Sequence, residues 1–163
     1  MRWESGYLLH IHIAPMASAN MVELDEAELV VGKGIVNDRY YKQNGSYSKI
    51  PDIRDVTLIE NEVLEALASN QPPLQEKPII LKPVEHRRNL TTSGVPLNYL
   101  VGKTFQIGEV ILKGGRLNFP CKYLADLLQK PLVLALYNRS GLNCSVERGG
   151  IIKKGDKIIQ VED

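Results

Sequence analysis

The sequence has few cysteines, almost no net charge and no long hydrophobic run, and each of these absences excludes a class of protein. The 163 residues include two cysteines, which cannot form the disulfide framework of a small secreted domain. The formal net charge is +1, whereas a dedicated nucleic-acid-binding protein carries a large basic excess. No apolar segment approaches the roughly 18 residues of a transmembrane helix. We therefore expect a cytoplasmic protein that binds neither nucleic acid nor a membrane.

Common catalytic motifs are also missing. The sequence contains no P-loop, no dinucleotide-binding glycine fingerprint, no G-x-S-x-G nucleophile elbow and no H-E-x-x-H zinc motif. His10 and His12 share a predicted strand face, but no third ligand accompanies them, and His86 lies far along the chain. The most frequent nucleotide-binding and hydrolytic classes are thus excluded, and a three-ligand zinc site is not indicated.

The hydrophobic pattern predicts one mainly β domain over residues 1–163, with a few short helices. Leu9, Ile11 and Ile13 alternate with polar residues, which is the period of a half-buried strand. Short strands separated by glycine and proline indicate a closed or nearly closed barrel. The predicted strands are Tyr7–Ala14, Met21–Leu24, Glu28–Val31, Pro78–Leu81, Arg88–Thr92, Thr104–Ile107, Glu109–Lys113, Leu132–Leu136, Asn143–Glu147 and Lys157–Val161.

Two helices are predicted. The first covers Leu58–Asn70, because Thr57 and Glu60 have the spacing of a capping box before an apolar stripe. The second runs from Pro120 to Pro131, since proline suits the first position of a helix and ends a helix that precedes it.

Cys121 is the first candidate for chemistry, because it lies at the predicted start of the second helix. The positive end of the helix dipole stabilises a thiolate, which can act as a nucleophile, carry a persulfide or bind a soft metal. Cys121 also heads the apolar stripe of that helix, so a buried structural thiol is the alternative interpretation. Cys144 lies within a predicted strand and is interpreted as a core residue.

Two arginine motifs are the second candidate. Arg87-Arg88-Asn89 offers guanidinium groups and an amide that suit a phosphate or another anion. In a strand, neighbouring side chains face opposite ways, so at most one of these arginines is expected to face a given site. Asp38-Arg39-Tyr40 follows a glycine-containing turn and offers a further arginine. A solvated basic edge and a surface ion pair are the respective alternatives.

Taken in order, these segments resemble the MOSC family, named after the C-terminal domain of molybdenum cofactor sulfurases. Asn37 stands where the family usually has a glycine. The segments that carry the resemblance are Gly32-Lys33-Gly34 with Asn37-Asp38-Arg39-Tyr40, Arg54–Leu67, Arg87-Arg88-Asn89-Leu90, Leu97–Gly108, Phe119-Pro120-Cys121, Arg139-Ser140-Gly141-Leu142, and Val146 with Gly149–Asp156.

The resemblance implies a MOSC-type β-barrel that binds the molybdenum cofactor (molybdopterin), with Cys121 as the molybdenum ligand. It implies that Arg88 and Asn89, with Arg39 and Asp38, hold the phosphate and pterin, and that Arg139 is a further anion contact. Family members that reduce N-hydroxylated compounds and family members that transfer sulfur both carry additional domains that this sequence lacks. We therefore expect an external electron donor for a reductase, or a persulfide donor for a sulfur carrier or sulfurtransferase that uses Cys121. A non-catalytic protein that delivers the cofactor is the remaining alternative.

Overall fold

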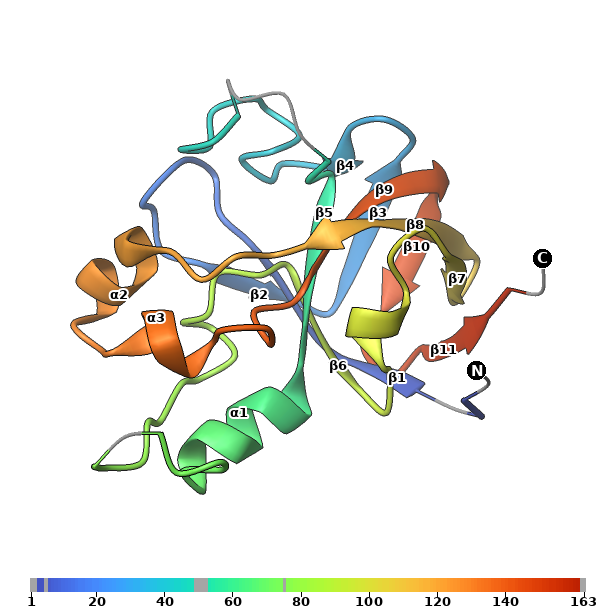
Figure 1. Cartoon of the computed structure of the whole chain (residues 1–163). Helices are drawn as coiled ribbons and strands as arrows, with labels where there is room; N and C mark the ends of the chain where they lie inside the picture. The colour runs from blue at the N-terminus through green and yellow to red at the C-terminus, as the bar shows by residue number, and fades with distance from the viewer. Residues whose placement is uncertain (1–2, 5, 49–52, 75, 162–163) are drawn as a thin grey trace.

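The computed structural model describes residues 3–4, 6–48, 53–74 and 76–161, and within them a closed seven-stranded β-barrel is the central element (Figure 1). Each barrel strand is antiparallel to its neighbours, except that β5 and β6 are parallel. In spatial order the barrel strands are β1 (Gly6–Ile13), β11 (Lys157–Gln160), β7 (Thr104–Ile107), β8 (Val110–Leu117), β9 (Leu142–Arg148), β5 (Val56–Glu60) and β6 (Leu90–Ser93), which pairs with β1 again.

Two smaller groups of elements accompany the barrel. β2 (Val22–Leu24) extends the barrel sheet beside β1, and β10 (Gly150–Lys153), β3 (Glu26–Val30) and β4 (Gly34–Ile35) form a second sheet. The helices lie together on one side of the barrel in Figure 1. They are α1 (Asn61–Ala68), α2 (Lys122–Leu128) and α3 (Leu132–Ala135), with a 3₁₀ turn, η1, over Leu97–Tyr99. The prediction of a mainly β barrel with a few short helices is confirmed.

The hydrophobic core has two parts, which meet at β5. Leu58 belongs to the cluster inside the barrel, whereas its neighbour Ile59 belongs to the cluster formed with the helices, and neither side chain is exposed. Full burial of one such side chain contributes about 1.5–3 kcal/mol. β5 is therefore covered on both faces, by the barrel interior and by the helical layer.

This double burial explains why the predicted helix over Leu58–Asn70 is wrong at its start. A strand that is buried on both faces is a continuous apolar run, and its period does not distinguish it from a buried helix. The structure has β5 up to Glu60 and α1 only from Asn61, with no side-chain hydrogen bond at the helix cap. The Glu60 carboxylate instead accepts a hydrogen bond from the Leu97 amide at 2.8 Å.

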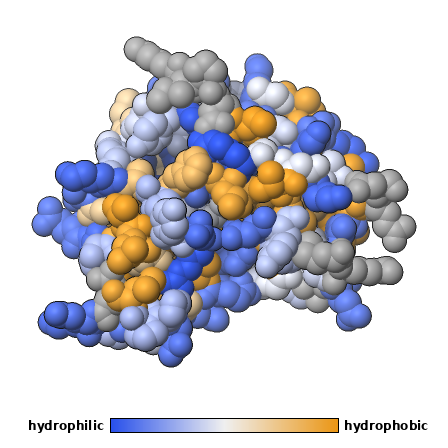
Figure 2. Space-filling model, viewed as in Figure 1, coloured by the Kyte–Doolittle hydropathy of each residue, from blue (hydrophilic) through white to orange (hydrophobic). Residues whose placement is uncertain are grey.

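The predicted strand over Leu132–Leu136 is also wrong, because residues 132–135 form α3. Leu132 and Ala135 are buried against the other helices, while Val133 and Leu134 are exposed. Figure 2 shows hydrophobic surface over this helix. A short helix with apolar residues on both faces has no helical period in its sequence, so five apolar residues resemble a strand.

Other elements also differ from prediction in their presence or bounds. Residues 78–81 form no strand. The predicted strand over Arg88–Thr92 is β6, which begins two residues later at Leu90, so Arg88 and Asn89 precede it. The predicted helix from Pro120 to Pro131 is shorter and covers Lys122–Leu128 as α2. Within the described part of the chain, no helix is long and apolar enough to cross a membrane.

Gly141 permits the close approach of β9 and β5. Its φ is +106°, and a Cβ atom there would lie 2.0 Å from the Leu58 carbonyl oxygen. Gly102 also has a positive φ, +75°, but a Cβ atom there would meet nothing within 4 Å.

We predict that Gly141→Ala lowers the free energy of unfolding by about 3 kcal/mol or more, and Gly102→Ala by about 1 kcal/mol. Urea unfolding of both variants measures the difference, and equal losses would contradict the close-approach argument.

Candidate functional site

A pocket of about 230 Å³ lies against the outer face of the barrel wall formed by β8, β9 and β5. Arg116, Asn143 and Thr57 are cross-strand neighbours on these three strands, and all three line the pocket. Leu58 and Leu142, which alternate with them along the strands, belong to the barrel core. Because strand side chains alternate between faces, the pocket side chains point away from the barrel interior.

The pocket lining is strongly positive. It includes five arginines, and the described lining residues include no aspartate or glutamate. Since the whole chain has a formal net charge of +1, the positive field is local to this pocket. The arginines are Arg39, Arg54, Arg87, Arg88 and Arg116, and the other charge-bearing or aromatic lining residues are Tyr40, Tyr47, Phe119, Cys121 and Tyr123.

Cys121 lines this pocket and is half-buried, at the N-cap position of α2. α2 has only seven residues, and Cys121 interacts electrostatically with Arg88. Burial raises the pKa of the neighbouring Tyr47 hydroxyl, and the charge of Cys121 and a hydrogen bond with it raise it further.

Cys144 is fully buried within the barrel core. Burial, assisted by the charge of Asp55, raises the pKa of the Cys144 thiol far above its usual range. Cys144 is therefore a core residue, and Cys121 is the cysteine that faces the pocket. Within the described part of the chain, no three His, Cys, Asp or Glu side chains are placed to hold a metal ion together.

The Arg88 guanidinium forms part of the pocket wall and is fixed by four hydrogen bonds. Nε donates to the Ser140 carbonyl oxygen at 3.1 Å, and Nη1 donates to the His86 carbonyl oxygen at 2.8 Å. Nη2 donates to Asn118 Oδ1 at 2.8 Å and to Ser140 Oγ at 2.7 Å. Burial lowers the pKa of Arg88 to about 10, an effect that the charge of Cys121 opposes. Arg88 thus carries a fixed positive charge at neutral pH.

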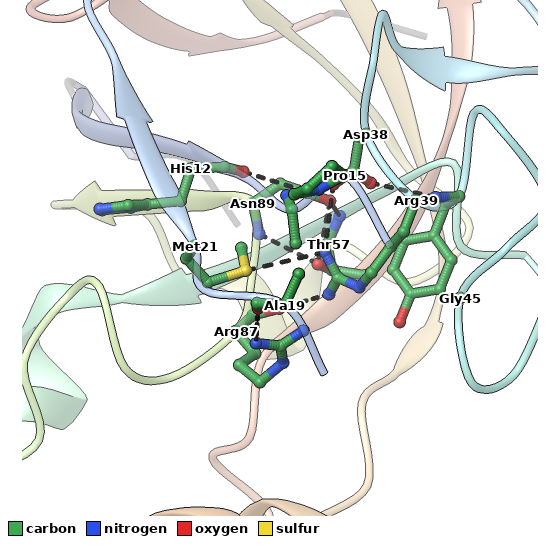
Figure 3. Close-up of polar contacts among 12 residues, drawn as sticks. His12, Pro15, Ala19, Met21, Asp38, Arg39, Gly45, Thr57, Arg87 and Asn89 are labelled. Carbon is green, nitrogen blue, oxygen red and sulfur yellow. Dashed lines mark hydrogen bonds and ion pairs between the residues drawn. The ribbon is translucent and has the colours of Figure 1, made fainter. Parts of the chain in front are cut away.

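Arg39 and Asp38 form a buried ion pair next to the pocket (Figure 3). Asp38 Oδ1 accepts from Arg39 Nη1 and from the Ala14 amide, each at 3.1 Å. Arg39 Nη2 donates to the Arg87 carbonyl oxygen at 2.9 Å, and its guanidinium lies 4.4 Å from the centre of the Tyr40 ring. Arg39 lines the pocket, whereas Asp38 lies behind it and orients Arg39.

The Asn89 side chain is fully buried and connects two barrel strands (Figure 3). Its Oδ1 accepts from the Thr57 amide at 3.1 Å and from Thr57 Oγ1 at 3.2 Å, and its Nδ2 donates to the His12 carbonyl oxygen at 3.1 Å. The Asn89 amide in turn donates to Thr57 Oγ1 at 3.1 Å. Asn89 does not line the pocket; it holds β5 and β1 against the segment that carries Arg88.

Arg87 and Arg88 both line the pocket, so the expectation that only one of them faces a given site is wrong. The physical reason is that β6 starts at Leu90, and Arg87 has a left-handed backbone with φ of 63° instead of a strand conformation. Arg87 Nη1 donates to the Ala19 carbonyl oxygen at 2.7 Å. Burial and the charge of Arg39 lower the pKa of Arg87.

Arg139 lies apart from the other predicted site residues. Its Nε donates to the Ala135 carbonyl oxygen at 2.7 Å and its Nη1 to the Gln71 carbonyl oxygen at 2.6 Å, and it does not line the pocket.

Two arginines of the pocket lining, Arg54 and Arg116, were not predicted as site residues from the sequence. Their guanidinium groups lie 5.8 Å and 5.3 Å from the ring centres of Tyr47 and Phe119, respectively. No local motif marks Arg116, because it reaches the pocket through the pairing of β8 with β9.

Comparison with known proteins identifies one family. The model of the MOSC domain matches residues 48–159 of this chain. No curated protein sequence matches the chain.

Several solved structures share the fold. A YuaD protein from Bacillus subtilis has a TM-score of 0.77 and 22% identity, with 96% of each chain covered. YiiM from Geobacillus stearothermophilus has a TM-score of 0.71 and 15% identity, with 96% of this chain and 75% of that one covered. YiiM from Escherichia coli has a TM-score of 0.65 and 19% identity, with 100% of this chain and 71% of that one covered.

Two buried histidines beside the arginine segment make stability depend on pH. Burial lowers the pKa of His12, and burial together with the charge of Arg88 lowers the pKa of His86 well below the ordinary histidine value of 6.5. The unfolded chain therefore binds protons more readily than the folded one, and the free energy of unfolding falls as the pH drops below 6.5.

We predict that His86→Asn reduces this acid-induced loss, because asparagine does not titrate. Urea unfolding at about pH 7.5 and about pH 5 measures the loss of unfolding free energy. Both pH values lie above most of the range in which carboxylates protonate. An equal loss of stability in the wild type and in the variant would contradict the assignment of the effect to His86.

Proposed function

The chain belongs to the MOSC family, and we propose that it binds the molybdenum cofactor in the arginine-lined pocket, with Cys121 as the ligand of the metal. The observation that carries this proposal is the composition of the pocket. Five arginines, no carboxylate among the described lining residues and one half-buried cysteine surround a single cavity. This combination suits a ligand that has both an anionic group and a metal with affinity for sulfur.

The residues of the pocket fit such a cofactor in their chemistry. A cysteine thiolate is a soft donor of the kind that binds metals with affinity for sulfur. Arginine presents a planar fork of donors that matches the oxygen atoms of a phosphate. Tyr40, Tyr47 and Phe119 add aromatic faces, against which a planar pterin ring packs favourably.

The arginines divide into two roles by what they already bind. Arg88 donates four hydrogen bonds to the protein, so its contribution is a fixed positive charge in the wall. Arg87 lines the same pocket with one hydrogen bond, to Ala19, and we assign it the direct contact with the phosphate. Arg39 supports this contact by bonding the Arg87 carbonyl oxygen, and Asp38 and Asn89 hold the arginines in position. Arg139 is outside this set.

The reaction that we propose is the reduction of an N-hydroxylated compound. It converts an N–OH group into N–H and water, and it consumes two protons and two electrons from an external donor. The bound cofactor supplies the redox chemistry. The protein holds Cys121 at the N-cap of α2 beside Tyr47, whose hydroxyl is protonated at neutral pH like that of an ordinary tyrosine and has its pKa raised further by burial.

A sulfur carrier that holds a persulfide on Cys121 is the second candidate, favoured by the placement of one half-buried cysteine in an open pocket. A persulfide is small and carries one charge, so it does not require five arginines. Cofactor delivery without catalysis would use the same pocket as the proposed reductase.

We predict how much molybdenum and pterin each variant contains when it is produced in a host that makes the molybdenum cofactor. The wild type and Cys144→Ala contain molybdenum and pterin in equal amounts. Cys121→Ser loses molybdenum, because a hydroxyl is a harder and poorer donor than a thiolate. Arg87→Ala retains about tenfold to a hundredfold less pterin, the loss expected from one charge-assisted hydrogen bond. Metal analysis, pterin fluorescence and cyanolysable sulfur are measured on the same preparations.

Each alternative has its own result. Stoichiometric cyanolysable sulfur without molybdenum or pterin would replace the proposal with the sulfur carrier. Full molybdenum and pterin occupancy with no reduction of N-hydroxylated compounds, given a chemical electron donor, would favour the delivery protein.

A further inference from the structure

Two consecutive arginines enter the same pocket, and an extended chain cannot achieve this. In a strand the side chains of Arg87 and Arg88 would lie on opposite faces. Here Arg87 has φ of 63°, in the left-handed region that residues other than glycine seldom occupy. The strain of this backbone has to be compensated by the surrounding structure.

Two compensating contacts come from His86, in addition to the hydrogen bond of Arg39 to the Arg87 carbonyl oxygen. Its imidazole is fully buried, and Nδ1 accepts a hydrogen bond from the Arg88 amide at 2.9 Å. The His86 carbonyl oxygen accepts from Arg88 Nη1 at 2.8 Å. One residue thus binds both the backbone and the guanidinium of Arg88, and the two contacts close a turn with Arg87 at its apex.

The Arg88 amide determines which nitrogen of His86 carries the proton, because an amide N–H can only donate. His86 Nε2 lies 2.8 Å from Thr91 Oγ1 in β6. A neutral imidazole has one protonated nitrogen, and Nδ1 is the acceptor for the Arg88 amide. The proton is therefore on Nε2, which donates to the threonine hydroxyl. The ring is held at both nitrogens, as expected for a side chain that fixes the geometry of a site.

We propose that His86 is the positioning residue of the anion pocket: its neutral, Nε2-protonated ring holds Arg87 in the left-handed conformation, so that Arg87 and Arg88 face the same ligand. This inference rests on the proposed function of the pocket as an anion site. It extends that function to a residue that neither lines the pocket nor belongs to the arginine motif.

The role can be separated from simple filling of space, because one substitution keeps the acceptor and another removes it. Asparagine places a side-chain oxygen where it accepts from the amide two residues further along, as in an Asx-turn. Leucine fills a comparable volume but leaves the buried Arg88 amide without its acceptor. Thr91→Val removes the partner of Nε2. Thr92→Val is its matched control, since the buried Thr92 hydroxyl has no hydrogen-bond partner within the described structure.

The experiment measures the binding of inorganic phosphate by calorimetry and hydrogen exchange of the Arg88 amide by NMR. The wild type and His86→Asn should bind phosphate within about threefold of each other and protect the amide. His86→Leu should bind about tenfold more weakly and lose the protection, as expected when a buried donor loses its acceptor. Thr91→Val should weaken binding, and Thr92→Val should not. The imidazole ¹⁵N shifts of the wild type should report an unprotonated Nδ1.

The outcomes separate the two proposals. A wild type that does not bind phosphate would overturn the anion-site function and, with it, this inference. Wild-type phosphate affinity in both His86→Leu and Thr91→Val, or a proton on Nδ1 in the wild type, would overturn the role of His86 alone. If His86→Leu does not fold, Thr91→Val and the NMR measurements decide.

Discussion

The hydrogen bonds of the buried Asn89 side chain are the constraint on which the site depends. They connect Thr57 in β5 with the His12 carbonyl oxygen in β1 at the point where the chain enters β6. Replacing Asn89 by an apolar residue would leave several buried polar groups unpaired, and each such group costs about 1–3 kcal/mol. Because these bonds are satisfied within the protein, the segment before β6 has a fixed position. The Arg88 guanidinium therefore meets Asn118, just after β8, and Ser140, just before β9.

The pocket shows how a protein of almost zero net charge presents a concentrated positive field. Burying a guanidinium is costly unless its donors are satisfied, and Arg88 donates to Ser140, Asn118 and His86. Arg39 is neutralised in part by Asp38, which does not line the pocket. The charges are thus held before any ligand arrives, so an anion that enters meets a site that needs little reorganisation.

The barrel and part of the site are predictable from the sequence for physical reasons. Short strands separated by glycine and proline, together with the order of the family motifs, predicted the barrel. Cys121, Arg88 and Arg39 do line one pocket. β5 was predicted as part of a helix, because burial on both faces removes the alternation of polar and apolar residues that marks a strand. The position of Arg116 at the pocket depends on the pairing of β8 with β9. The position of Arg87 depends on the hydrogen bond between the His86 ring and the Arg88 amide. Neither contact has a local sequence signal.

If Cys121 and the arginines form one anion-binding site, inorganic phosphate bound by the arginines protects Cys121 from alkylation. The measurement is the rate of iodoacetamide labelling at each cysteine, by mass spectrometry, as inorganic phosphate is added. We predict that Cys121 reacts faster than the buried Cys144, and that phosphate slows the reaction of Cys121 to a plateau in the wild type but not in Arg87→Ala. Labelling of Cys121 that is unaffected by phosphate in the wild type, or that is no faster than labelling of Cys144, would contradict a shared anion site.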